Sequence, residues 1–154
     1  MTKEIINFKD YKSGDKINIK IDKNCNWYYK NEKFTHPKIL QYFKSLLGKD
    51  QKGYYLSNKY EKYYITVDDT PFCVNYIITE NETMFVYTDS EKKIPLDFDK
   101  LIMRNNGIFY YTFDNIPMKF SRKAQADLLQ YAIEENNIYY LIINNKKYKI
   151  KIDN

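Results

Sequence analysis

The same order of motifs occurs twice in this chain, and that recurrence constrains the fold more than any other feature of the sequence. In each half an aromatic triplet is followed by an aromatic–hydroxyl pair, a run with helical spacing and two strand-like runs. The matched landmarks are Trp27–Tyr29 with Phe109–Tyr111, Phe34–Thr35 with Phe120–Ser121, Tyr54–Leu56 with Tyr139–Leu141, and Lys62–Asp68 with Lys147–Asp153. The sequence therefore predicts two related strand–helix–hairpin repeats, residues 17–68 and 108–153.

The hydrophobic periodicity assigns the elements of each repeat. Ile17, Ile19 and Ile21 alternate with polar residues, which is typical of a half-buried strand. The spacing then changes to a helical one, with Thr35 as the predicted N-cap and Gly48 as the predicted stop. The residues on one face of this helix are Ile39, Tyr42, Phe43, Leu46 and Leu47, and those of the second helix are Leu128, Leu129, Ala132 and Ile133.

Residues 70–97 connect the two halves. They are predicted to form a hairpin around Asn81–Glu82 and an edge strand at Lys92–Leu96, because Pro95 has no amide to donate in a central strand. No linker separates the halves. The expected fold class is α+β: one domain, residues 1–154, in which two repeats share a core and a β-hairpin lies between them. Aromatic residues make up 18% of the chain, which favours sheet.

The net charge of +5 raises the question of a nucleic-acid partner. Only Arg104 and Arg122 are arginines, and every other basic residue is a lysine. Base edges and phosphates are bound best by the planar guanidinium group, so the composition argues against nucleic acid as the partner. A weak single-strand binder that uses tyrosines and lysines remains one alternative.

Residues that would direct the chain to a membrane or an oxidising compartment are missing from the sequence. Met1–Asp15 is polar and has no secretory apolar region, and no apolar run is long enough to span a membrane. Cys25 and Cys73 form no CxxC pair. We therefore expect a cytoplasmic protein with reduced thiols and no membrane partner.

No catalytic or metal-binding motif stands out. His36 is the only histidine, so the chain lacks the histidine set that zinc or non-haem iron sites use. There is no glycine-rich phosphate loop and no nucleophile elbow. We expect no metal, no cofactor and no catalytic residues, and an enzyme with an unfamiliar site remains a second alternative.

The most distinctive string is Asp68–Phe72, which follows an alternating strand. It is either a tight turn, in which an aspartate binds backbone amides, or a ligand contact. Arg122, in the first turn of the second helix, is placed either to hold a carboxylate or phosphate at the positive end of that helix or to pair with Asp68 or Asp69. Five Tyr-Tyr pairs place one ring on each face of a sheet, for packing or for binding.

With these residues assigned, the chain resembles a bacterial family known as domain of unknown function 1285 (DUF1285). The resemblance rests on Asn26–Tyr29, the helix Ile39–Leu47, Gly53–Leu56 and Ile65–Phe72, and Lys119–Arg122 resembles the approach to the family's second helix. The chain departs from the family at Asn24–Cys25 and His36–Pro37. The resemblance implies two repeated α/β motifs and a signalling or ligand-sensing role, with no enzymatic activity.

The sequence thus predicts a non-enzymatic module, signalling or regulatory in role, that binds a small molecule or a protein. A homo-oligomer is left open. The predicted ligand-binding residues are Trp27, Asp68, Asp69, Thr70, Phe72 and Arg122.

Overall fold

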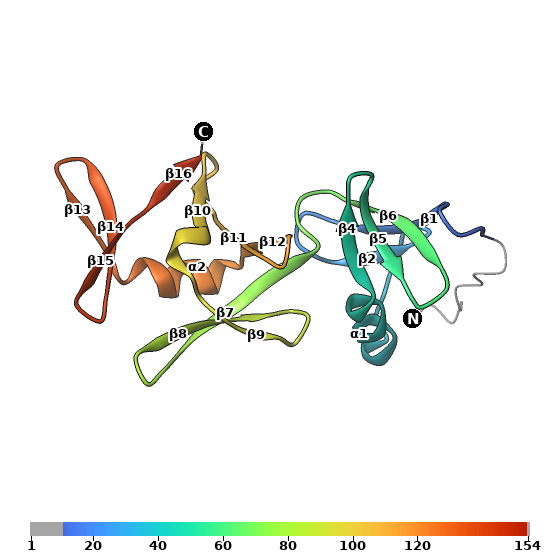
Figure 1. Cartoon of the computed structure of the whole chain (residues 1–154), viewed down its shortest axis with the longest axis horizontal. Coiled ribbons are helices and arrows are strands. Elements are labelled where there is room, and N and C mark those ends of the chain that lie inside the picture. The colour runs from blue at the N-terminus through green and yellow to red at the C-terminus, as the bar shows by residue number, and fades with distance from the viewer. Residues whose placement is uncertain (1–10, 154) are drawn as a thin grey trace. The chain divides into compact units, whose positions relative to one another are not determined.

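Two compact units make up the chain in the computed structural model, which describes residues 11–153 (Figure 1). The units are Met1–Pro71 and Phe72–Asn154, so the predicted connecting strands fall almost wholly in the second unit. Within the described residues each unit has one α-helix and is otherwise built mainly from strands. The α+β class is confirmed, with β-structure predominant. Neither helix is long and apolar enough to cross a membrane.

The first unit is a six-stranded mixed sheet with the order β3-β2-β1-β6-β5-β4. Strand β1 pairs with β2 in antiparallel and with β6 in parallel fashion. Its isoleucines are buried, as the alternation predicts. The elements are β1 Lys16–Ile21, β2 Trp27–Tyr29, β3 Glu32–Lys33, α1 Pro37–Ser45, β4 Leu47–Asp50, β5 Gly53–Ser57 and β6 Lys62–Val67.

Helix α1 begins one residue later and ends earlier than the sequence predicts. The N-cap is His36, whose Nδ1 accepts the Ile39 amide at 3.3 Å, so the assignment of Thr35 is wrong. Pro37 explains the shift, because its fixed φ suits the first helical position. The helix ends at Ser45, and Gly48 pairs with Tyr55 in the sheet instead of stopping a helix.

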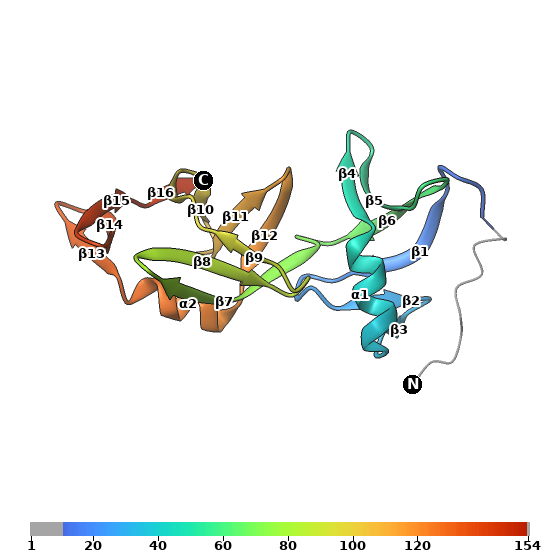
Figure 2. The same cartoon turned by 60° about the horizontal axis from the view of Figure 1, so that its bottom comes forward.

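The second unit contains a seven-stranded sheet, β16-β10-β11-β12-β7-β8-β9, and a three-stranded antiparallel sheet, β13-β14-β15 (Figure 2). Helix α2 connects β12 to β13. The elements are β7 Phe72–Glu80, β8 Thr83–Thr88, β9 Lys93–Pro95, the 3₁₀ turn η2 Phe98–Lys100, β10 Leu101–Arg104, β11 Phe109–Phe113, β12 Ile116–Phe120, α2 Arg122–Leu129, β13 Ala132–Glu135, β14 Ile138–Ile143, β15 Lys146–Lys149 and β16 Lys151–Asp153.

The hairpin predicted around Asn81–Glu82 is confirmed, and so is the edge position of the strand that contains Pro95. Ser121 is the N-cap of α2, as expected, and its Oγ accepts the Ala124 amide at 3.1 Å. The second helix is shorter than predicted, because Ala132 and its neighbours form β13. Neither Cys25 nor Cys73 is a free thiol, so the expectation of reduced thiols is wrong.

The two units share part of their order of strands and helices. In the first unit three antiparallel strands, a helix and three more antiparallel strands follow one another, and β1 lies parallel to β6. In the second unit the segment from β10 onward has three antiparallel strands, a helix and three more antiparallel strands, and then a further strand, β16, which lies parallel to β10. A relation of the two segments as sequence repeats stays a prediction.

Candidate functional site

Three of the predicted site residues are buried. Trp27, on β2, is 1% exposed, and its indole Nε1 finds no hydrogen-bond partner among the described residues. Thr70 is also buried, and Phe72 is buried at the first position of β7. A ligand that touches these side chains has to reach into a packed interior, so their role as a site stays a prediction.

The charged residues of the predicted site lie at the surface. The Asp68 carboxylate is 3.3 Å from the Lys20 ammonium group, and both side chains are exposed. Asp69 is half-buried. Arg122 is exposed at the first position of α2. Asp68 and Asp69 belong to the first unit and Arg122 to the second, and each unit is described by itself.

The tyrosine pairs separate as the sequence predicts on β6, where Tyr63 is buried and Tyr64 is half-buried. The Tyr64 hydroxyl donates to the Asp50 carboxylate at 2.7 Å, and this bond raises the pKa of Tyr64 and lowers that of Asp50. The ring of Tyr55 contacts that of Tyr64 edge-on, at 6.1 Å between centroids. Cross-strand packing therefore accounts for this aromatic face.

A different place in the second unit offers an open site. Strand β14 pairs with β15, and the last bond of this ladder runs from the Ile150 amide to the Tyr139 carbonyl oxygen, at 2.9 Å. Beyond Ile150 the chain leaves this sheet. It joins the seven-stranded sheet as β16, in which Lys151 and Ile152 lie opposite Ile102 and Met103. The two strands therefore diverge like a fork.

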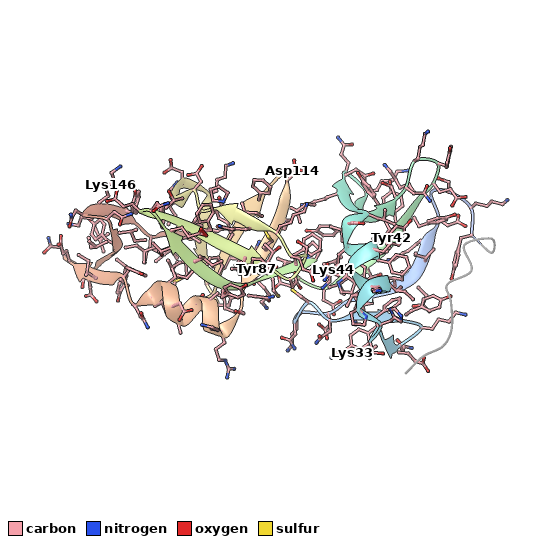
Figure 3. The ribbon with its side chains drawn as sticks, turned by 90° about the horizontal axis from the view of Figure 1, so that it is seen from below. Lys33, Tyr42, Lys44, Tyr87, Asp114 and Lys146 are labelled. Carbon is pink, nitrogen blue, oxygen red and sulfur yellow. The ribbon has the colours of Figure 1, made fainter. Side chains whose placement is uncertain are left out.

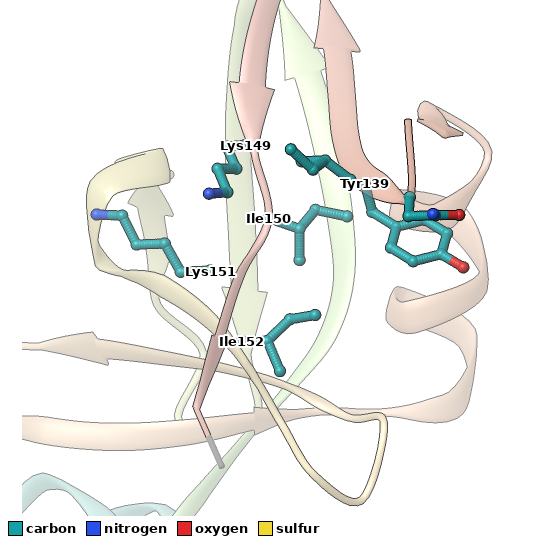
Figure 4. Close-up of a pocket in the computed structure, with 7 residues that line it drawn as sticks. Tyr139, Lys149, Ile150, Lys151 and Ile152 are labelled. Atoms are coloured by element: carbon teal, nitrogen blue, oxygen red, sulfur yellow. The ribbon is translucent and has the colours of Figure 1, made fainter. Parts of the chain in front are cut away.

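The space between the diverging strands is a groove of about 590 Å³, which we call the fork groove. In Figure 4 Ile150 and Ile152 point towards Tyr139, whereas Lys149 and Lys151 point to the opposite side of their strand. Ile152 is 53% exposed and Tyr139 47%, although both present apolar carbon atoms to the groove. The residues that line the groove are Asn137, Ile138, Tyr139, Lys149, Ile150, Lys151 and Ile152.

The strand that borders the fork groove is basic, although its lysine side chains point away from the groove floor. Two of its lining residues are lysines, and none is a carboxylate, a histidine or a cysteine. The Lys151 ammonium group donates to the Asp99 backbone oxygen at 2.8 Å and lies 3.9 Å from the Asp99 carboxylate. A hydrogen bond to Glu134 raises the pKa of the Tyr139 hydroxyl. An apolar floor with a basic rim suits an anionic ligand that also has an apolar part.

No residue of the fork groove is among the predicted ligand-binding residues, although Tyr139–Tyr140 is one of the five tyrosine pairs left open for packing or for binding. From residue 147 onward, lysines alternate with Tyr148, Ile150 and Ile152, a pattern that predicts a half-buried strand by analogy with Lys62–Asp68. One signal was available: a strand whose alternate positions are all lysines has a strongly basic face. All three residues of β16 are exposed, because the chain leaves the three-stranded sheet after β15 and joins the seven-stranded sheet. No local sequence pattern indicates this change of sheet.

Fold and groove together define a mixed-sheet α+β protein with a basic, partly apolar surface groove. Residues 9–70 match the family model described as "Domain of unknown function (DUF1285), N-terminal domain", so the resemblance to this family is confirmed. The match ends before the second unit, and the motif Lys119–Arg122 lies outside it. No curated protein matches the chain.

Two solved structures share the fold. A crystal structure of a DUF1285 family protein from Silicibacter pomeroyi DSS-3 has a TM-score of 0.73 and 16% identity, with 98% of this chain and 90% of that chain covered. One from Shewanella baltica OS155 has a TM-score of 0.60 and 18% identity, with 69% and 85% covered. At these identities the likeness concerns the fold alone.

Proposed function

We propose that this protein is a non-enzymatic binding module and that the fork groove is its contact surface. The observation that carries the proposal is the divergence of β14 and β16 after Ile150, which leaves exposed isoleucine and tyrosine side chains around a groove. The groove volume lies within the range of about 300–1,000 Å³ that is usual for ligand sites.

The chemistry of the lining residues favours binding over catalysis. General acid–base catalysis needs a group that gains and loses a proton near neutral pH, and nucleophilic catalysis needs an activated thiol, hydroxyl or amine. The groove presents an amide, three isoleucines, two lysines and a tyrosine whose pKa is raised. These groups attract and hold a ligand but form no nucleophile–base pair.

An anionic aromatic dye, 8-anilinonaphthalene-1-sulfonate, tests this proposal. Its rings match the isoleucines and its sulfonate matches the lysines, so its fluorescence should rise when it binds. We expect Ile152→Glu to weaken dye binding by about tenfold or more, because it places a negative charge on the groove floor. The matched control is Ile39→Glu, an isoleucine of 38% exposure on α1 in the first unit. Equal dye affinity in both variants would exclude the fork groove as the binding surface.

A second candidate function rests on the β7–β8 hairpin. The rings of Tyr76 and Tyr87 stack there at 4.9 Å, and the Lys93 ammonium group lies 4.5 Å from the centre of the Phe85 ring. Figure 3 labels Tyr87 on this hairpin. Exposed aromatic rings beside lysines are a surface on which single-stranded bases stack. Lys93 also pairs with Glu80, which reduces its attraction for phosphate. Binding of oligo-dT that falls steeply with salt and is lost in Tyr76→Ala would favour this candidate.

The finer interpretations of the sequence are part of the proposal. A duplication is supported by the matching order of elements and by the parallel pairing of first and last strands in both segments. A signalling role and a cytoplasmic location remain proposed as well. The cytoplasm usually keeps cysteines reduced, and neither cysteine of this chain is a free thiol. The location therefore needs a direct test, and cell fractionation provides it.

A further inference from the structure

We propose that the fork groove binds an extended peptide segment of a partner protein, which adds to β16 as a further strand and alternates apolar with acidic residues. This inference rests on the proposed function, since it names the ligand of the same groove. Strand addition to a sheet edge is a recurrent mode of peptide recognition, in which main-chain hydrogen bonds provide affinity and side-chain pockets provide specificity.

Strand β16 is an open edge. It is the terminal strand of the seven-stranded sheet, and within residues 11–153 its one neighbour is β10. The opposite edge is β9, where Pro95 removes an amide and so protects the edge against strand addition. Strand β16 contains no proline. The two edges of this sheet therefore differ, and β16 is the one able to accept a strand.

The backbone of β16 points in the required direction. The amide of Ile150 donates towards β14, to the Tyr139 oxygen. In a strand the N–H and C=O of one residue point to the same side, and consecutive residues alternate sides. Lys151 therefore directs its backbone groups to β10, and Ile152 directs its own to the fork groove. An incoming strand meets a donor and an acceptor at Ile152.

The side chains of this segment specify the incoming sequence. Lys149, Ile150, Lys151 and Ile152 alternate charge with apolar surface, and Figure 4 shows the two kinds on opposite sides of the strand. Cross-strand partners on one face interact directly. The residue opposite Ile152 should be apolar and the one opposite Lys151 acidic. On this side Lys149 already faces Tyr140 of β14, so it is a diagonal neighbour of that acidic residue. No ion pair of Lys149 is found among the described residues, so its charge is open to a partner.

The test uses a fluorescein-labelled peptide of about eight residues that alternates valine and glutamate, long enough to form an ordinary strand. Binding is followed by fluorescence anisotropy. One control peptide has the same composition with valines and glutamates in separate blocks, and a second has alternate backbone amides N-methylated. We expect each control to bind about tenfold more weakly or worse, because it loses either the side-chain register or the main-chain hydrogen bonds.

Matched protein variants locate the contact. Lys149→Glu should weaken the alternating peptide by about tenfold, whereas Lys146→Glu, the same charge change at the other end of β15, should have a much smaller effect (Figure 3). Ile152→Pro removes the amide of the open edge and should abolish binding, while Ile152→Val keeps it. The N-methylated peptide makes the same test on unaltered protein, so misfolding of the proline variant does not decide the result.

The outcomes distinguish the inference from the function on which it rests. Equal binding of the block or N-methylated peptide overturns strand addition. If the dye binds in a way that depends on Ile152 but the alternating peptide does not bind, the peptide inference is overturned. The proposal that the fork groove is a binding surface then still stands. Absence of both removes the groove as a binding site. A dimer of the free protein that Ile152→Pro dissociates would show that the edge is occupied by a second copy and would also overturn the inference.

Discussion

Replacing Gly48 with alanine should destabilise the first unit, and the structure gives the reason. Gly48 on β4 lies opposite Tyr55 on β5. A Cβ atom at this position would lie 2.6 Å from the Cε1, Cζ and hydroxyl oxygen of the Tyr55 ring. Real contacts are never this close, so the ring must rotate away. The backbone of Gly48 is not in the left-handed region, and the whole cost therefore arises from the ring.

The magnitude follows from what the ring loses. Its edge contact with Tyr64 is of a kind worth about 0.5–1.5 kcal/mol. The Lys62 ammonium group, 4.2 Å from the ring centre, adds about 0.5–1 kcal/mol for an exposed site. Glycine is less favourable than alanine inside a strand by about 0.5–1 kcal/mol, which offsets part of the loss. We expect a net decrease in the free energy of unfolding of about 1 kcal/mol.

A double-mutant cycle isolates this cause. In a Tyr55→Ala background the ring is absent, so Gly48→Ala should be neutral or stabilise the unit by about 0.5–1 kcal/mol. Trp27, the only tryptophan of the chain, lies in the core of the first unit, and its fluorescence during urea unfolding reports on that unit. Gly53, at φ +131°, is the control, because Gly53→Ala is strained by its backbone in either background. An equal cost of Gly48→Ala with and without the Tyr55 ring would refute the reasoning.

Two further predictions concern the N-cap of α2 and the Asp50 carboxylate. Ser121→Ala removes the hydroxyl that accepts the Ala124 amide and donates to the Asn75 carbonyl oxygen, and it should lower the free energy of unfolding of the second unit by about 1 kcal/mol. Ser121→Thr, which keeps the hydroxyl, should largely restore it, as chemical denaturation followed by circular dichroism would show. The pKa of Asp50 is lowered by the Tyr64 hydroxyl and by Lys62, so its stabilising contribution is complete above the ordinary value of 3.8 and is lost as pH falls through the lowered pKa. Asp50→Asn should therefore weaken the first unit at neutral pH and flatten its acid dependence, and an unchanged acid profile would contradict this assignment.

The sequence predicts the strands of this fold better than the ends of its helices. Alternation locates β1, and Pro95 identifies an edge strand, because both signals act within a few residues. Helix α1 was extended too far, because Leu47 fits a helical face as well as it fits a strand. What assigns it to β4 is pairing with β5, a tertiary effect.

The asparagine-containing turns of this sequence are signals for more hairpins than the hydrophobic pattern alone predicts. Five hairpins close with two residues that both have positive φ, and asparagine occurs in every one of them. From sequence, a hairpin is predicted at Asn81–Glu82 and another between Tyr139–Leu141 and Lys147–Asp153, the latter without use of the Asn144–Asn145 pair. The five pairs are Lys30–Asn31, Asn81–Glu82, Asp114–Asn115, Asn136–Asn137 and Asn144–Asn145. The pair Asn136–Asn137 closes the hairpin of β13 and β14. Recognising it as a hairpin turn would have assigned Ile133 to a strand instead of to the second helix.

The candidate site was the least predictable part, for a physical reason. The predicted residues Trp27 and Thr70 were chosen for their distinctive motifs, and both are buried. The fork groove instead depends on two strands that part after Ile150, and the residues that face it look like ordinary strand positions. A local pattern assigns faces within one sheet, but it does not indicate that a strand changes sheets.

The parallel pairing of β10 with β16 also bears on the order in which this protein folds during synthesis. Residues 101–104 cannot complete their side of the sheet until residues 151–153 have been made, so this contact closes a long loop and forms late. The neighbouring hairpins close much shorter loops and can form earlier. The edge that we propose as a peptide acceptor is thus absent from nascent and partly folded chains, and a partner that recognises it would select for protein whose second unit has finished folding.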